Sequence, residues 1–297
     1  MTLVMINGKI VDSSEAKVSA WDRGLYFGDG VYEVVQGYAG KLWGFTQHFR
    51  RFQRSLREIE ILDVNLSQIE QWVFLAFQEA KMPNCVVYFH ITRGCGIRSH
   101  VPGDDLGRPQ FLLYVKPAPN NTKRVANGIS AITCPDIRWK RCDIKTLNLL
   151  PNVMASQAAH KVGAEEAIFV SDGTITEGAS SCFFSVLDGK LVTRPLDHQV
   201  LPSVTRQAIL VIAEKIGLEI IERPITIREG YHAEEAFVSS SGYEIRPIIK
   251  IDDHVISGGK PGVVTSKIIE RFLSHTRSGE AFDDLVKDTR FQLLPAL

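Results

Sequence analysis

The chain alternates between short apolar runs and glycine-containing turns along most of its length. β-Branched and aromatic residues dominate the runs at 31–38 and 85–92, which is typical of buried β-strands. Three of the Asn-Gly and Asp-Gly dipeptides separate two short apolar runs, which is a strong signal for a two-residue hairpin turn. These dipeptides are Asn7-Gly8, Asp172-Gly173 and Asp188-Gly189. The pattern therefore predicts antiparallel hairpins both near the N-terminus and in the middle of the chain.

Other segments repeat apolar residues at the spacing of an α-helix. Phe45, Phe49, Phe52 and Leu56 form one such stripe, with Thr46 as the expected N-cap. Further helices are expected from a Ser67/Glu70 capping box to about Lys81, over 152–161, after an N-cap at Ser203, and over 263–273. Strands interspersed with helices in this way predict a mixed α/β fold.

A Pro- and Asn-rich stretch at 116–122 separates two series of predicted elements. We expect a smaller N-terminal α/β domain over 1–117, an interdomain linker over 118–122 and a larger C-terminal domain over 123–297. With 297 residues, the chain is long enough for two hydrophobic cores. The polar segment from Thr276 onward shows little pattern, and either an ordered extension or a frayed end is compatible with it.

The overall charge favours neither nucleic acid nor an anionic membrane surface, since 34 basic residues balance 34 acidic ones. The five cysteines form no CxxC pair, and the eight histidines show no metal-binding spacing. Neither a signal peptide nor an apolar run of about 20 residues is recognisable. We therefore expect a soluble, cytoplasmic protein that acts on small molecules, without a metal.

Lys145 stands in an unusually apolar setting, between Ile144 and Thr146 and just before Leu147 and Leu149. An apolar setting favours the neutral, nucleophilic amine, which is the form that makes Schiff bases. The environment alone is a weak signal, because most lysines in mixed segments extend to solvent.

Groups that suit a phosphorylated cofactor follow Lys145 along the chain. Glu177 precedes Gly178, and hydroxyl side chains occur at predicted strand ends and at a predicted helix start. The hydroxyls are those of Ser180, Ser181, Ser203, Thr205, Ser239, Ser240 and Ser241. A reactive lysine, a carboxylate and several hydroxyls fit pyridoxal 5'-phosphate, which has an aldehyde, a ring nitrogen and a phosphate.

Four motifs, in the expected order, resemble those of the class IV aminotransferases, the pyridoxal-phosphate family of D-amino-acid and branched-chain aminotransferases. The motifs are DRGLYFGDGVYE, RCDIKTLNLL, TEGASSCFF and LPSVTRQ. The resemblance runs from Met5 to about Asp253 and is closest to the D-amino-acid (D-alanine) aminotransferases. It implies a two-domain α/β fold of the D-amino-acid aminotransferase type (fold type IV), with the cofactor between the domains. It also implies a homodimer with sites near the interface.

The resemblance implies roles for individual residues. Lys145 would hold pyridoxal 5'-phosphate as a Schiff base and then move the α-proton, and Glu177 would pair with the ring nitrogen. The family's HxxR pattern maps onto His48 and Arg51, so Arg51 rather than Arg50 would bind the phosphate. The other cofactor-binding residues implied are Val204, Thr205, Ser240, Ser241, Ser181 and Arg138. For Arg138, simple pairing with Asp136 or Asp143 is an alternative.

Arg98 and His100 separate the activities within the family. Two residues apart on an extended segment, their side chains point the same way and can grip one carboxylate. Spacing alone leaves a solvated loop equally open. In D-amino-acid aminotransferases, an arginine and a histidine in this loop trap the substrate carboxylate and reach into the neighbouring subunit's site. The tyrosine that matches Tyr32 lies near the same carboxylate.

The expected reaction is therefore transamination between a D-amino acid such as D-alanine and a 2-oxo acid such as 2-oxoglutarate or pyruvate. A branched-chain L-amino-acid or (R)-amine transaminase, or an aminodeoxychorismate lyase, would share Lys145 and Glu177. Outside the family, a cofactor-free Schiff-base enzyme and a non-catalytic binding scaffold remain alternatives. Departures at Ser203, Cys182 and Ile97 bear on substrate range more than on cofactor use.

Overall fold

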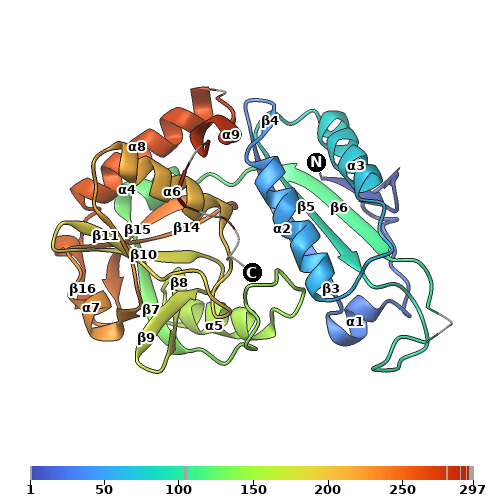
Figure 1. The fold of residues 1–297 in the computed structure, drawn as a ribbon, viewed down its shortest axis with the longest axis horizontal. Coiled ribbons are helices and arrows are strands. Elements are labelled where there is room, and N and C mark those ends of the chain that lie inside the picture. The colour runs from blue at the N-terminus through green and yellow to red at the C-terminus, as the bar shows by residue number, and fades with distance from the viewer. Residues whose placement is uncertain (1, 104–105, 279, 288, 292, 294–297) are drawn as a thin grey trace. The chain divides into compact units, whose positions relative to one another are not determined.

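The computed structural model describes residues 2–103, 106–278, 280–287, 289–291 and 293. The chain forms two compact units (Figure 1). The first comprises the chain up to Ala118 together with Ile144–Leu149, and the second comprises Pro119–Asp143 and the chain from Leu150 onward. Lys145, which the sequence placed with the larger C-terminal domain, thus belongs by its contacts to the first unit.

An antiparallel sheet forms the first unit, with strand order β2-β1-β6-β5-β3-β4. Its strands are β1 (Leu3–Ile6), β2 (Lys9–Val11), β3 (Gly30–Tyr38), β4 (Lys41–Leu42), β5 (Cys85–Thr92) and β6 (Gln110–Pro117). The N-terminal hairpin is confirmed, because Asn7 and Gly8 both have positive φ, 47° and 81°. A type I′ turn requires that backbone, which matches the twist of the flanking strands.

Two long helices, α2 (Phe45–Glu58) and α3 (Leu66–Ala80), cover one face of this sheet (Figure 1). Phe52 on α2 and Phe89 on β5 are both fully buried, with ring centroids 5.1 Å apart. The stripe predicted from Phe45 to Leu56 is therefore confirmed as the core-facing side of α2. A short helix, α1 (Arg23–Phe27), precedes β3.

Both predicted N-caps in this unit were wrong. Helix α2 begins after Gly44, whose φ of 66° only glycine adopts readily, so Thr46 lies inside the helix. Helix α3 is capped by Asn65, whose side chain accepts a hydrogen bond from the Gln68 amide, and Ser67 lies inside the first turn. Asparagine is as good an N-cap as serine, and here it comes first along the chain.

The second unit is built on a larger mixed sheet, with strand order β12-β11-β10-β14-β15-β7-β8-β9-β13 and β16 beside β15. Its strands are β7 (Ile129–Pro135), β8 (Glu166–Ser171), β9 (Thr174–Gly178), β10 (Cys182–Leu187), β11 (Lys190–Thr193), β12 (Ile220–Glu222), β13 (Ile225–Thr226), β14 (Glu235–Ser240), β15 (Glu244–Ile251) and β16 (His254–Val255). The hairpins at Asp172-Gly173 and Asp188-Gly189 are confirmed by positive φ at all four residues.

Helices pack around this sheet. They are α4 (Thr122–Asn127), α5 (Leu150–Lys161), α6 (Val204–Lys215), α7 (Ile227–Tyr231), the 3₁₀ turn η1 (Ser257–Gly259), α8 (Val263–Ser278) and α9 (Phe282–Leu285). The Ser203 N-cap is confirmed, since its Oγ accepts the Arg206 amide at 3.1 Å.

The described part of the C-terminal tail is an ordered extension. Phe282, Leu285 and Phe291 are buried, and the Gln207 side chain donates to the Phe291 carbonyl at 2.9 Å. The tail therefore packs against α6. In the part of the chain that the structure describes, no helix combines the length and apolarity needed to cross a bilayer.

Candidate active site

Lys145 lies beside the start of strand β3 in the first unit. Its carbonyl accepts the Tyr32 amide at 3.0 Å, and its own amide donates to Ser55 Oγ at 3.2 Å. Its half-buried side chain places Nζ 4.2 Å from the centroid of the Tyr32 ring. The Tyr32 ring in turn stacks on Tyr88, with centroids 5.6 Å apart. Strand β3 and helix α2 thus fix the lysine and the predicted substrate-binding tyrosine side by side.

Behind this pair lies a buried ionic cluster. Arg51 donates Nε and Nη2 to the two carboxylate oxygens of Glu33, each at 2.8 Å, and His48 Nδ1 lies 2.8 Å from the same carboxylate. The three residues are 0–2% exposed, whereas Arg50 points to solvent. The structure therefore turns Arg51 inward and Arg50 outward, and binding of a phosphate by Arg51 stays a prediction.

The cluster holds its charges in a defined state. Burial favours protonated Glu33, but the charge of Arg51 and the hydrogen bonds from Arg51 and His48 prevail and lower its pKa from 4.5 to about 2. Burial lowers the pKa of His48; the Glu33 carboxylate opposes that fall, and the positive charges of Arg51 and Lys145 add to it. The result is an ionised carboxylate that orients a buried guanidinium by two parallel hydrogen bonds.

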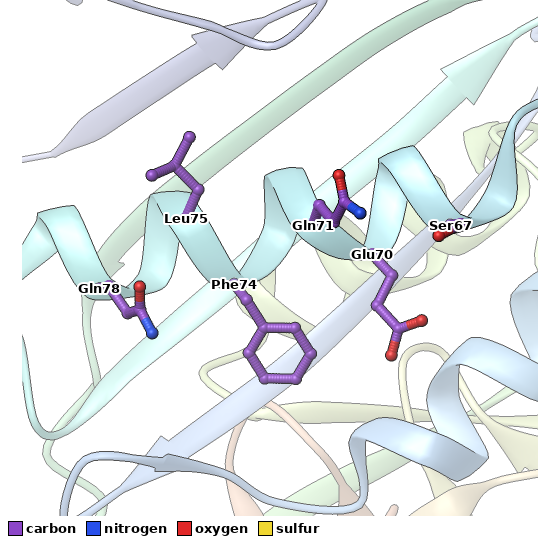
Figure 2. A pocket seen from close by; sticks show the side chains of 6 residues that line it. All are labelled: Ser67, Glu70, Gln71, Phe74, Leu75 and Gln78. Carbon is purple, nitrogen blue, oxygen red and sulfur yellow. The ribbon is translucent and has the colours of Figure 1, made fainter.

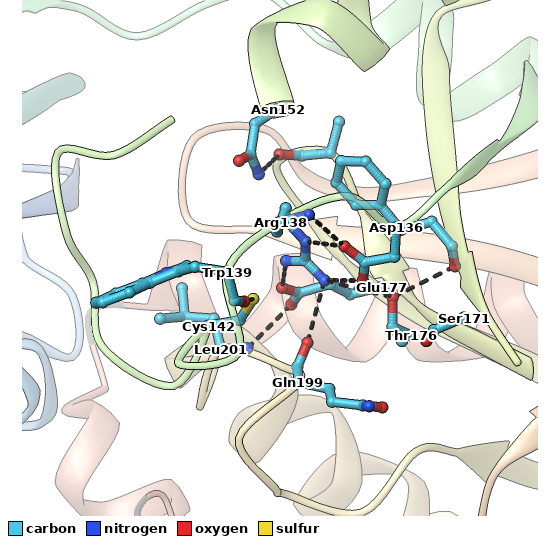
Figure 3. A network of polar contacts seen from close by, with 12 residues as sticks. Asp136, Arg138, Trp139, Cys142, Asn152, Ser171, Thr176, Glu177, Gln199 and Leu201 are labelled. Carbon is cyan, nitrogen blue, oxygen red and sulfur yellow. Dashed lines mark hydrogen bonds and ion pairs between the residues drawn. The ribbon is translucent and has the colours of Figure 1, made fainter. Parts of the chain in front are cut away.

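Glu177 in the second unit is held by a network of polar groups (Figure 3). One oxygen accepts from Arg138 Nη1, and the other accepts the Leu201 amide at 3.1 Å. Arg138 also pairs with Asp136 at 2.7 Å and donates to the Gln199 carbonyl at 3.0 Å. Arg138 thus pairs with Asp136, the alternative that the sequence left open, and also pairs with Glu177. Burial raises the pKa of Glu177, and the Arg138 guanidinium opposes that rise.

Hydroxyl groups gather at the N-terminus of α6. Thr205, fully buried in the first turn, has its Oγ1 3.4 Å from Ser241 Oγ, just after β14. Val204 is the first residue of the helix, and Ser240 is the last of β14. The first amides of a helix lack partners within the helix and carry a partial positive charge. This arrangement suits a phosphate group.

Ser181 points into a different network. Its hydroxyl donates to Glu166 Oε2 at 2.7 Å, as does the hydroxyl of Tyr243 at 2.7 Å, while Glu166 Oε1 accepts the Ala179 amide at 3.2 Å. Burial and the Glu166 charge raise the pKa of Tyr243 well above its usual range. Glu166 therefore joins the turn that carries Ser181 to the turn that follows Ser240.

Arg98 and His100 lie on an exposed loop of the first unit, yet both contact one ring. The Arg98 guanidinium carbon is 5.0 Å from the centroid of the Phe27 ring, and the His100 ring lies 5.3 Å from the same centroid. The side chains therefore gather on the same side of the loop, as their spacing predicts.

Several of these residues were absent from the sequence-based site. Glu33 interrupts an apolar strand and Glu166 precedes an apolar run. An isolated acid in such a position indicates a buried carboxylate with a partner, because charged side chains are rarely buried unpaired. Asp136, Ser55 and Phe27 carried no comparable signal.

The described surface also has an open depression of about 440 Å³ on the outer side of α3 (Figure 2). Its lining residues are Ser67, Glu70, Gln71, Phe74, Leu75 and Gln78. All belong to one helix and none is a predicted site residue. Among the described residues, no group of His, Cys, Asp and Glu side chains is arranged to hold a metal ion.

The motifs and the fold agree with one family. The family model "Amino-transferase class IV" matches residues 30–251, so the chain belongs to the class IV aminotransferases. A D-alanine aminotransferase of Staphylococcus haemolyticus is 39% identical over 279 residues, covering 94% of this chain and 99% of the relative.

Solved structures support the same fold. The branched-chain amino acid aminotransferase of Escherichia coli superposes with a TM-score of 0.86 at 22% identity, over 98% of this chain and 99% of that one. The 4-amino-4-deoxychorismate lyase of Pseudomonas aeruginosa has a TM-score of 0.79 at 26% identity, over 91% and 98%. The expected α/β fold of the aminotransferase type is confirmed.

Proposed function

We propose that this enzyme is a pyridoxal-phosphate-dependent aminotransferase that moves the amino group of D-amino acids such as D-alanine to a 2-oxo acid, 2-oxoglutarate or pyruvate. The observation that carries the proposal is the pairing of Arg98 and His100 on the Phe27 ring, because a guanidinium and an imidazole can both donate hydrogen bonds to a free α-carboxylate. The similarity to D-alanine aminotransferases over nearly the whole chain supports the same reaction.

The residues present fit pyridoxal 5'-phosphate. An amine at Lys145, an oriented buried cation at Arg51, hydroxyls at the start of α6 and a buried carboxylate at Glu177 match its aldehyde, phosphate and ring nitrogen. When bound, this cofactor supplies a carbonyl that condenses with amines and a ring that accepts electrons released at the substrate Cα.

The protein's own groups would then divide the work. Lys145 Nζ would hold the cofactor and, once released, would carry the proton that leaves the substrate Cα. The Tyr32 ring limits where that amine can move. The Glu177 carboxyl, which Arg138 and the Leu201 amide fix, would keep a proton at the ring nitrogen.

Several donors would hold the phosphate. Arg51 contributes charge, the amides of Val204 and Thr205 contribute the helix N-terminus, and the hydroxyls of Thr205, Ser240 and Ser241 complete the set. A direct role for Ser181 stays a prediction, since its hydroxyl bonds to Glu166.

We further propose a homodimer in which Arg98 and His100 reach the partner subunit's substrate, where Tyr32 binds the same carboxylate. Large apolar side chains are exposed around this loop, including Trp21 (57%), Ile97 (73%) and Val101 (75%). A second copy of the chain covering them would bury that surface. A cytoplasmic location is part of the proposal, and the five free cysteines support a reducing compartment.

The structural likeness to a branched-chain aminotransferase and to a 4-amino-4-deoxychorismate lyase makes those activities alternatives. The purified enzyme, supplied with cofactor and 2-oxoglutarate, is incubated with D-alanine, L-alanine or L-leucine, and the 2-oxo acid formed is measured. Pyruvate from D-alanine alone supports the proposal. Turnover of L-leucine in its place would reassign the enzyme to branched-chain L-amino acids.

A further inference from the structure

Arg23 is a buried arginine that belongs to none of the groups assigned above. It lies at the start of α1 and is 4% exposed. Its Nε donates to Asp29 at 2.8 Å, Nη1 donates to the Ser99 carbonyl at 2.6 Å, and Nη2 donates to the His100 carbonyl at 3.1 Å. One guanidinium thus grips the backbone of the exposed loop at two successive residues.

The same arginine also contacts the Phe27 ring, against which the loop packs. Its guanidinium carbon lies 4.9 Å from the centroid of the Phe27 ring, which Arg98 and His100 also contact. A cation is attracted to the face of an aromatic ring. Arg23 and Phe27 therefore restrain both the backbone and the side chains of the loop.

We propose that Arg23 is a positioning residue for the substrate carboxylate. By fixing the carbonyls of Ser99 and His100, it presents Arg98 and His100 in their binding arrangement before substrate arrives. Without this restraint, the exposed loop would lose conformational entropy when substrate binds, and that loss would reduce the affinity for substrate. The inference rests on the proposed function, because it takes those two side chains as the carboxylate-binding pair.

Arg93 provides a matched control, because it pairs with the same aspartate in the same way. Its Nε lies 2.9 Å from Asp29, while Nη2 and Nη1 donate to the carbonyls of Ile59 and Glu60 at 2.6 and 3.0 Å. Arg93 therefore ties down the residues after α2 and makes no described bond to the loop. Arg23 and Arg93 differ in which backbone segment each one holds.

The test compares Arg23→Met and Arg93→Met with wild type as full-length, cofactor-loaded enzymes. Hydrogen exchange of the amides at 97–101 is read by mass spectrometry, and kcat and KM are measured with D-alanine. In Arg23→Met we expect exchange at 97–101 to quicken at least tenfold and KM to rise about tenfold, with kcat changed less than about threefold. In Arg93→Met we expect both to stay within about twofold of wild type.

Arg23→Lys keeps a charge beside Asp29 but cannot bond both carbonyls, so it should fall between wild type and Arg23→Met, and it serves if the methionine variant does not fold. Equal effects of the Arg23 and Arg93 variants, or unchanged exchange at 97–101 in both Arg23 variants, would overturn the inference. If wild type failed to react with D-alanine while Arg23→Met still loosened the loop, the proposed function would fall and the loop restraint would stand.

Discussion

Replacing Glu33 by glutamine tests the buried ionic cluster of Glu33, His48 and Arg51, the predicted phosphate-binding arginine. The substitution keeps the size of the side chain but removes its charge. Arg51, 2% exposed, then lacks the carboxylate that receives two of its hydrogen bonds at 2.8 Å. A buried guanidinium without a counter-charge is costly, because desolvation is no longer offset.

The magnitude follows from the pKa of Glu33, which falls from 4.5 to about 2 on folding. At about 1.36 kcal/mol per pH unit, this difference corresponds to ~3 kcal/mol of stability at neutral pH. Breaking a buried ion pair generally costs about 3–5 kcal/mol, which agrees. Because the folded pKa is depressed, the contribution is complete above about pH 4.5 and is lost as pH falls toward about 2.

The assay is urea unfolding of the cofactor-free protein at several pH values. At pH 7 we expect Glu33→Gln to lower the free energy of unfolding by ~3 kcal/mol, with the deficit shrinking below about pH 4.5. Glu70→Gln, an exposed residue on α3, is the control and should stay within about 0.5 kcal/mol of wild type. A deficit under about 1 kcal/mol at pH 7, or one that is independent of pH, would refute the account of this cluster.

Two further predictions concern the second unit. Thr205→Val removes the buried hydroxyl beside Ser241 and should weaken pyridoxal 5'-phosphate binding about tenfold in a spectroscopic titration. The control, Thr122→Val at an exposed position, should leave the affinity unchanged. Equal affinities of the two variants would show that Thr205 does not bind the phosphate. Glu166→Ala deprives the hydroxyls of Ser181 and Tyr243 of their shared acceptor and should lower the free energy of unfolding by ~3 kcal/mol. The neighbouring, exposed Glu165→Ala should cost less than about 1 kcal/mol, and an equal loss in both variants would show that Glu166 has no special part.

Features set by neighbouring residues were predictable from the sequence. The turn at Asn7-Gly8 and the cap at Ser203 depend on local backbone preferences, and both are confirmed. The caps of α2 and α3 were wrong because two acceptable capping residues lie within a few positions of each other. In the structure Gly44 is the N-cap of α2 and Asn65 is the N-cap of α3.

Contacts between distant segments were not predictable in the same way. Arg23 is 76 residues from Ser99, and Glu166 is 77 residues from Tyr243. An acid such as Glu33 inside an apolar strand signals that some partner exists, but several arginines on the following helix could have supplied it. Only the fold selects Arg51, because it turns that side chain toward β3.

The central claim is that Lys145 carries the cofactor. The measurement is reduction of the cofactor-loaded protein with sodium borohydride, followed by proteolysis and mass spectrometry of the lysine-containing peptides. Reduction makes the link between an amine and the cofactor's carbonyl carbon permanent, so the modified lysine keeps the added mass. The account predicts this mass on Lys145, and its loss when D-alanine is added before the reductant. A modification on another lysine, or none in protein saturated with pyridoxal 5'-phosphate, would contradict it.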